Sequence, residues 1–197
     1  LLHSAQDVRG PDAVEQELRT ALQGNELEVF FQPQIDLTSG ACVAVEALIR
    51  WNHPTRGMVD PQLIAQLCEE RGMIGHLTQF VLNTTLRHQT FWRTQGVDVS
   101  VAINITALSL ADATFPGQVE QALATWNADP KRLTLELTES SIVENEGMAL
   151  EFMNQLNAMG CQLAIDDFGT GYSSFAYLRQ FPLRELKIDQ MFVRNIL

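Results

Sequence analysis

Two adjacent carboxylates, Asp166 and Asp167, follow an apolar segment typical of a buried strand and precede a loop that contains Gly169 and Gly171. Successive side chains of a strand point to opposite faces, so both carboxylates can face one site only if the strand ends between them. Such a pair suits a divalent cation that lies beside an anionic ligand. The alternative is a solvated Asp-Gly turn without chemistry, and the rest of the chain has to decide between the two.

Five predicted strands have one apolar face and one face that becomes polar toward the carboxyl end. In 163–166, for example, Leu163 and Ile165 alternate with Ala164 and Asp166. Helices that cover the apolar faces would bring the polar ends together, and these carry Glu46, Asn104, Glu136, Asp166 and Lys187. A (β/α) barrel has its chemistry at this end of its strands, whereas the strands of an open doubly wound sheet are apolar on both faces. The pattern therefore predicts an α/β fold of the TIM-like (β/α) barrel type.

The converging side chains form a set of hard oxygen donors. Two carboxylates about 4 Å apart repel each other by roughly 4 kcal/mol at an effective dielectric constant of about 20, so a cation is expected between them. Such donors suit Mg²⁺ or Mn²⁺, and the histidines lack the spacing of a zinc site. The expected metal ligands are Glu46, Asn104, Glu136, Asp166 and Asp167. The alternative is an internal ion-pair network in which Lys187 and Arg50 neutralise the carboxylates.

The remaining elements place these residues on alternating strands and helices. Two strands at 27–35 and 41–51 flank a hairpin turn at 36–40 and are expected to pair antiparallel. Downstream, strands alternate with helices, which implies parallel pairing. The expected strands there are 97–106, 133–138, 162–166 and 185–189. The expected helices are 11–24, 61–71, 76–95, 115–126 and 147–159.

Composition narrows the class of protein. The chain has 197 residues, of which 46% are hydrophobic and 19% charged, enough for a folded core. Its net charge of −11 argues against a DNA-binding surface. No apolar run reaches the roughly 18 residues that span a membrane, so no membrane contact by this segment is expected. Three cysteines without metal-binding or paired spacing indicate a reducing compartment, and we expect the cytoplasm.

Several motifs occur in an order typical of one known family. Residues 46–51 read Glu-Ala-Leu-Ile-Arg-Trp, the signature that gives the EAL domain its name. The chain resembles an EAL domain, the cyclic di-GMP phosphodiesterase module, from about residue 18 to residue 197. The other matching segments are 31–33, 104–106, 136–140, 166–174 and 186–189. Each segment alone is a weak signal, but all of them in this order are specific.

The resemblance implies two-metal phosphoryl hydrolysis at the predicted site. One Mg²⁺ or Mn²⁺ would be held by Glu46, Asn104, Glu136 and Asp166. Asp167 would hold a second ion, and a water between the two ions would attack one phosphodiester of cyclic di-GMP. The product would be the linear dinucleotide pGpG.

The resemblance also implies supporting roles around this centre. Lys187 would lie beside the attacking water and orient it or help its deprotonation. Glu139 would hold the loop 169–174, which shapes the second metal position. Arg50 would pair with a ligand phosphate, which the planar fork of donors of an arginine suits. The residues expected to bind the nucleotide are Gln32, Leu48 and Arg50.

Chain length and ends lead to further expectations. A barrel of this kind takes about 250 residues, so a chain that stops after the sixth or so strand is expected to be incomplete at the C-terminus. The alternative function is then a non-catalytic cyclic di-GMP receptor or protein-interaction module. We expect residues 1–10 to be a linker or the tail of an upstream GGDEF or sensory domain and 11–197 to be the EAL domain. The resemblance also implies a homodimer with 174–178 near the contact.

Overall fold

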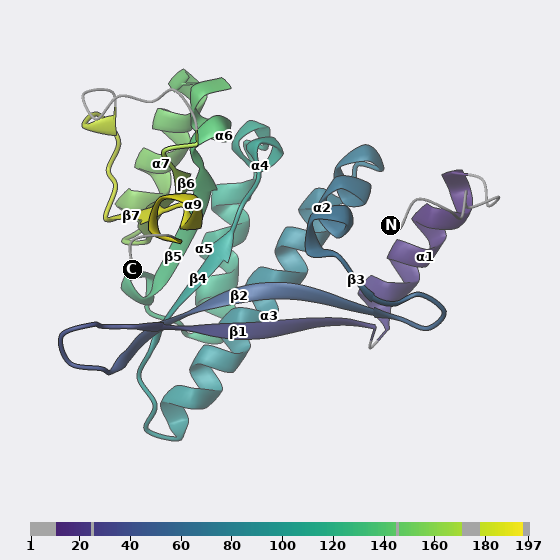
Figure 1. Cartoon of the computed structure of the whole chain (residues 1–197), viewed down its shortest axis with the longest axis horizontal. Helices are drawn as coiled ribbons and strands as arrows, with labels where there is room; N and C mark the ends of the chain where they lie inside the picture. Colours follow the sequence, from purple (N-terminus) through teal and green to yellow (C-terminus); the bar gives the residue numbers. More distant parts are fainter. Residues whose placement is uncertain (1–10, 25, 145, 171–177, 195–197) are drawn as a thin grey trace.

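The computed structural model describes residues 11–24, 26–144, 146–170 and 178–194. These residues form one seven-stranded sheet with helices packed along it (Figure 1). The strands are β1 Leu27–Ile35, β2 Cys42–His53, β3 Gly57–Val59, β4 Ser100–Asn104, β5 Leu133–Thr138, β6 Gln162–Phe168 and β7 Glu185–Ile188. The helices are α1 Pro11–Gln23, α2 Pro61–Glu70, α3 Ile74–Thr94, α4 Ala107–Ala111, α5 Phe115–Trp126, α6 Glu139–Glu144, α7 Glu146–Ala158 and α9 Gln190–Val193, with a 3₁₀ turn at Pro130–Arg132.

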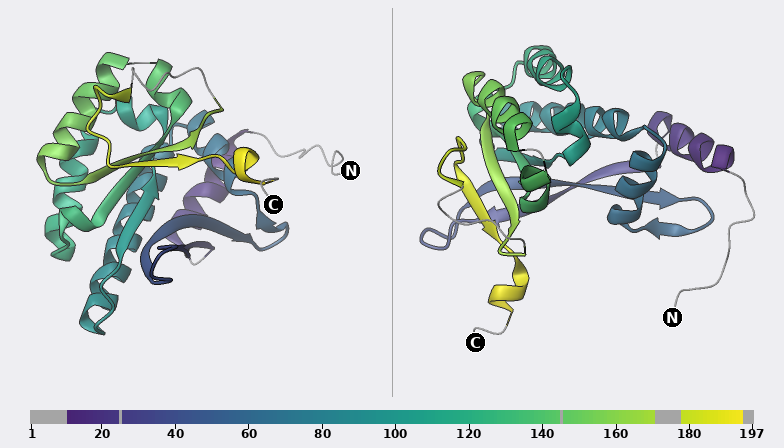
Figure 2. Two further views of the ribbon diagram at one scale, coloured as in Figure 1. Left: turned by 60° about the vertical axis from the view of Figure 1, so that its left-hand side comes forward. Right: turned by 90° about the horizontal axis from the view of Figure 1, so that it is seen from above.

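The sheet begins as a hairpin and continues as a parallel sheet. β1 pairs antiparallel with β2, and β3 pairs antiparallel with the far end of β2. From β2 onward the strands pair parallel in the order β2, β4, β5, β6 and β7. β1 and β7 are the outer strands in the described part of the chain, so the sheet is not closed (Figure 2). The α/β fold, the antiparallel first strand and the incomplete barrel are confirmed.

The apolar strand faces pack against helices on one side of the sheet. Val101, Ile103, Leu135 and Ile165 have no exposed surface and belong to the main core. This core lies between the sheet and helices α3, α5 and α7, which run side by side behind it (Figure 2). The polar alternate residues of the same strands therefore face the other side, away from these helices.

A second apolar cluster fixes the N-terminal helix and α2 to the end of β2. Leu18 of α1, Ile64 of α2 and Met73 are almost completely buried around Trp51. The indole nitrogen of Trp51 donates a hydrogen bond to Glu26 Oε2 at 3.1 Å. α2 begins with a side-chain cap, because the carboxylate of its N-cap residue accepts from the backbone two residues on. Among the described helices, none is both long and apolar enough to cross a lipid bilayer.

The structure differs from the sequence prediction mainly in short elements and strand ends. Strand β3 and helices α4, α6 and α9 were not predicted, since pieces of three to six residues carry little periodic signal. β4 covers only Ser100–Asn104 of the predicted 97–106, and β6 continues past Asp166 to Phe168. The predicted dimer segment 174–178 lies outside the described residues except for its last position.

Candidate active site

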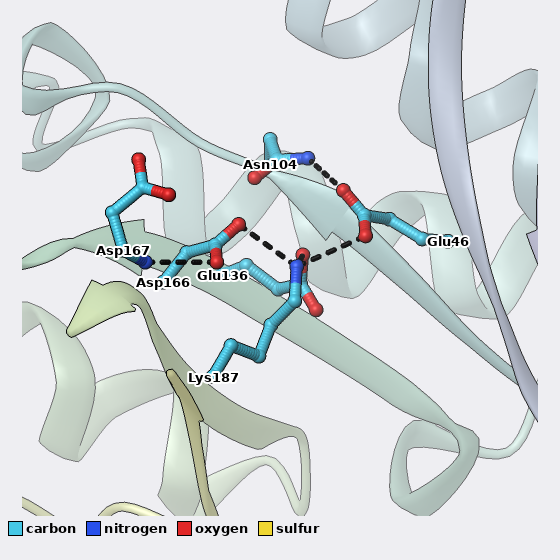
Figure 3. A network of polar contacts seen from close by, with 6 residues as sticks. All are labelled: Glu46, Asn104, Glu136, Asp166, Asp167 and Lys187. Carbon is cyan, nitrogen blue, oxygen red and sulfur yellow. Dashed lines mark hydrogen bonds and ion pairs between the residues drawn. The ribbon is translucent and has the colours of Figure 1, made fainter. Parts of the chain in front are cut away.

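The register of the strands brings the predicted polar residues together on the inner face of the sheet, the face that points away from helices α3, α5 and α7. Asn104 and Glu136 are direct neighbours in the pairing of β4 with β5. In the same register, Glu46 of β2 lies two residues before the level of Asn104, and Asp166 of β6 lies two residues after the level of Glu136. Because residues two apart share a face of the sheet, all four side chains point to the same side. Figure 3 shows them converging with Lys187 of β7.

The ammonium group of Lys187 lies at the centre of three carboxylates. Its Nζ donates to Glu46 Oε2 at 2.9 Å, to Glu136 Oε2 at 2.7 Å and to Asp166 Oδ2 at 2.8 Å. The amide of Asn104 donates to the other oxygen of Glu46 at 2.8 Å (Figure 3). The structure therefore unites four of the five predicted metal ligands. It also shows the Lys187 part of the predicted ion-pair network.

Burial gives these charges unusual proton affinities. Glu136 is 1% exposed, and this burial raises its pKa to about 7, with Lys187 opposing the rise and the carboxylate of Glu46 adding to it. Burial alone would lower the pKa of Lys187, but its hydrogen bonds to Asp166 and Glu136 more than offset this and raise it above the usual value. Lys187 therefore stays protonated at neutral pH.

The donor set fits a hard divalent cation. One ligand oxygen from each of Glu46, Glu136 and Asp166 lies within 4.8 Å of the others. The second carboxylate oxygen of Glu136, Oε1, is buried and has no hydrogen-bond partner among the described residues. A buried acceptor without a partner is rare in folded proteins. Carboxylate and amide oxygens are also the ligands that Mg²⁺ and Mn²⁺ prefer.

Asp167 lies beside this cluster and is not part of it. Its φ of 54° lies in the left-handed region, and the pairing of β6 with β7 is irregular at this point. The carboxylate of Asp167 points away from the three other carboxylates (Figure 3). Its backbone amide donates to Asp166 Oδ1 at 2.8 Å. Partial burial raises the pKa of Asp167, and the charges of Asp166 and Asp189 add to the rise.

Glu139, the first residue of α6, is hydrogen-bonded to the turn after β6. Its Oε2 accepts a hydrogen bond from the backbone amide of Gly169 at 2.9 Å, although the two residues are 30 positions apart. Glu139 is 2% exposed, and Gly169 has a φ of +101°, which favours glycine. Thr170 closes the same turn by donating to the carbonyl of Asp167. Glu139 thus contacts the first residue of the loop 169–174 that the resemblance assigned to it.

The predicted nucleotide-binding residues lie on the β1–β2 hairpin. Gln32 is opposite Glu46 in the register of the hairpin. Leu48 lines a cavity of about 550 Å³ that also contains Asn104 and is mostly apolar. The guanidinium of Arg50 donates to the Ile49 carbonyl at 2.8 Å. Leu48 and Arg50 therefore lie on the same strand as Glu46, and Gln32 lies beside Glu46 on the neighbouring strand β1.

Two neighbours of the site were missed from the sequence. Asp189 acts on the pKa of Asp167, and its signal was its place two residues after Lys187 on the same strand face. The guanidinium of Arg50 lies over the ring of Phe30, with 5.7 Å between Arg50 Cζ and the centre of the ring. That contact depends on the β1–β2 register, so the sequence alone carried no signal for it.

The family model "EAL domain" matches residues 15–197. The chain is 40% identical over 179 residues to "Cyclic di-GMP phosphodiesterase PdeR" of Escherichia coli, covering 91% of this chain and 27% of that protein. It is 38% identical over 181 residues to "Bifunctional diguanylate cyclase/cyclic di-GMP phosphodiesterase MucR" of Pseudomonas aeruginosa, covering 91% of this chain and 26% of that protein. The chain thus spans about a quarter of the length of these relatives.

A solved structure described as "PaMucR Phosphodiesterase, c-di-GMP complex" has a TM-score of 0.88 to this chain. The two are 37% identical, and the match covers 93% of this chain and 75% of the solved one. The matched family model spans the whole sheet and every residue of the carboxylate cluster. This chain belongs to the EAL domain family.

Proposed function

We propose that this chain is the catalytic domain of a metal-dependent phosphodiesterase that hydrolyses cyclic di-GMP to linear pGpG. The observation that carries the proposal is the convergence of Glu46, Glu136 and Asp166, with Asn104, at one end of parallel strands. The names of PdeR and MucR, and the cyclic di-GMP complex of the solved MucR domain, support the choice of substrate.

The carboxylate cluster would hold one Mg²⁺ or Mn²⁺ through Glu46, Asn104, Glu136 and Asp166, and Asp167 would contribute to a second position. Bound ions of this kind polarise a phosphodiester and lower the pKa of a bound water. Asp167 is suited to a separate position, because its carboxylate points away from the three others (Figure 3). Partial burial raises the pKa of Asp167, and the negative charges of Asp166 and Asp189 add to the rise, which a nearby cation would oppose.

Lys187 would act as a fixed positive charge and hydrogen-bond donor. Its raised pKa means that it keeps its proton at neutral pH. A lysine in this state can orient a water or stabilise negative charge on phosphate, but it does not accept a proton. A metal ion that takes these carboxylate oxygens would remove the hydrogen bonds that raise this pKa, so orientation of the water and help with its deprotonation both belong to this proposal.

Substrate would be positioned by the hairpin and by the turn after β6. Arg50 would pair with a ligand phosphate, for which its planar fork of donors is suited. Leu48 and Gln32 would contact the nucleotide from the same hairpin. Glu139 would act as a positioning residue, because it holds Gly169 and hence the turn that follows Asp167.

Further domains and partners belong to the same proposal. The chain covers about a quarter of relatives such as the bifunctional MucR, which supports an upstream GGDEF or sensory domain joined through residues 1–10. We also propose a homodimer and a cytoplasmic location. The described cysteines are free thiols, two of them buried, which suits a reducing compartment.

The test is turnover of cyclic di-GMP by this chain with Mg²⁺ or Mn²⁺, with pGpG followed by chromatography, beside a calorimetric titration with the nucleotide. Turnover that is abolished by EDTA and restored by metal supports the proposal. Binding without turnover would support the receptor role instead, which the neutralising contacts of Lys187 favour. Absence of both from a folded sample contradicts the two functions together.

A further inference from the structure

Lys187 occupies the place where a divalent ion would find its ligands. An ammonium group has three hydrogen-bond donors, and each carboxylate of the cluster accepts from Nζ at 2.7–2.9 Å. The same three residues form the only group of three or more acidic or metal-binding side chains within ligand distance in the described part of the chain. The ammonium therefore lies at the centre of the candidate metal site (Figure 3).

The remaining carboxylate oxygens do not offer a second complete site. Glu46 Oε1 accepts from Asn104, and Asp166 Oδ1 accepts from the backbone amide of Asp167. Glu136 Oε1 is the one oxygen of the cluster that is buried without a partner in the described structure. An ion that needs several ligands close to 2.1 Å must therefore take oxygens from Lys187.

We propose that Lys187 is the resident counter-ion of this carboxylate cluster and that a divalent ion binds by displacing its ammonium group. The inference rests on the metal site of the proposed function but adds a competition that this function does not require. Without metal, Lys187 offsets the repulsion among Glu46, Glu136 and Asp166, so the domain stays folded. With metal, the released ammonium becomes available to a ligand phosphate or a water.

The position of Lys187 in the sheet allows this displacement. β7 is an outer strand in the described structure, and it pairs with β6 through Glu185 and Leu186 before the register becomes irregular. Lys187 lies within the irregular part, ahead of the pair formed by Ile188 and Phe168. Its four-carbon side chain can swing out while the regular pairs of β7 remain in place.

The first experiment compares Mn²⁺ binding by the wild type and by Lys187→Met, using calorimetry. Loss of the competing ammonium should lower the Mn²⁺ dissociation constant by about tenfold or more, equivalent to about 1.4 kcal/mol. Lys131→Met is the matched control, because Lys131 is exposed and removes the same charge away from the cluster. It should bind Mn²⁺ as the wild type does. Unchanged or weaker binding by Lys187→Met would overturn the proposal.

Thermal unfolding in EDTA gives a second readout on the same proteins. Lys187→Met should unfold at a lower temperature than the wild type, because three carboxylates then face one another without a cation. Added Mn²⁺ should raise its unfolding temperature by more than that of the wild type. A variant as stable in EDTA as the wild type would contradict the counter-ion role.

The wild type itself allows a test that needs no variant. The sequence contains two lysines, Lys131 and Lys187, so labelling with ¹⁵N-lysine gives two ammonium signals, one of them an exposed reference. Saturating Mg²⁺ should move the Lys187 signal to the fast hydrogen exchange of an exposed ammonium and leave Lys131 unchanged. An unchanged Lys187 signal with Mg²⁺ bound would overturn this proposal alone. Absence of Mg²⁺ and Mn²⁺ binding in every protein would overturn the proposed metal site as well.

Discussion

Replacement of Glu46 by glutamine separates the stability of the carboxylate cluster from its chemistry. The substitution removes the attraction between Glu46 Oε2 and Lys187 Nζ at 2.9 Å, roughly 6 kcal/mol at an effective dielectric constant of about 20. It also removes the repulsion from Glu136 and Asp166, whose ligand oxygens lie within 4.8 Å of that of Glu46, at least about 3.5 kcal/mol for each. The two contributions nearly cancel, because Glu136, whose pKa is raised to about 7, carries only part of a negative charge at neutral pH.

We therefore expect Glu46→Gln to unfold in EDTA with a free energy within about 1 kcal/mol of that of the wild type. The side chain keeps its shape and an oxygen that accepts from Lys187. Its NH2 group replaces the oxygen that accepted from Asn104, and the Asn104 amide keeps a partner by rotating to present its own oxygen. Mn²⁺ should stabilise the wild type by binding the folded state and should stabilise the variant much less. Hydrolysis of cyclic di-GMP should be abolished, because the neutral amide is a far weaker metal ligand.

The assay is urea unfolding followed by tryptophan fluorescence, with and without Mn²⁺, beside turnover of cyclic di-GMP. Glu120→Gln is the matched control, because it removes the same charge from an exposed position on α5. A loss of more than about 2 kcal/mol in EDTA would refute the electrostatic reasoning and make Glu46 a structural ion-pair partner. Retained turnover would refute the assignment of Glu46 as a metal ligand.

Two further outcomes follow from contacts around the cluster, and a third follows from His88 on α3. Arg50→Ala should raise KM for cyclic di-GMP by about tenfold or more through loss of a phosphate contact, and Phe30→Ala should raise KM less, since its ring only supports the guanidinium. Steady-state kinetics measures both effects, and an unchanged KM in Arg50→Ala would contradict the phosphate role. Glu139→Ala should lower the free energy of unfolding by about 1–3 kcal/mol and reduce kcat, because the Gly169 amide loses a charged acceptor. Glu139→Gln should lose less stability and less activity than Glu139→Ala, which denaturant unfolding and steady-state kinetics measure. Burial and the neighbouring Arg87 lower the pKa of His88 below 6.5, so the unfolded state binds more protons as the pH falls through about 6.5 and the folded protein loses stability there. His88→Gln should make the free energy of unfolding less dependent on pH in this range, as measured by urea titrations at several pH values. An unchanged pH dependence would exclude His88 as its source.

Strand alternation predicted which side chains share a face because its period of two is a local property of the backbone. The bounds of β5 and α5 match the predicted 133–138 and 115–126 for the same reason, since their apolar periods are regular. The inner-face positions of Glu46, Asn104, Glu136 and Lys187 follow from this alternation. Short elements such as α6 and β3 have too few residues for a period to be detected.

The sequence by itself determined the residue types of the site, their strand faces and, through ordered motifs, the family. Tertiary structure decided how they meet. Strand register sets Lys187 at the centre of three carboxylates from three different strands and places Phe30 below Arg50. Asp167 has a positive φ where the pairing of β6 with β7 becomes irregular, which the alternation in the sequence does not predict. These features depend on interstrand pairing and local backbone strain, which arise from packing of the whole sheet and leave no periodic trace in the chain.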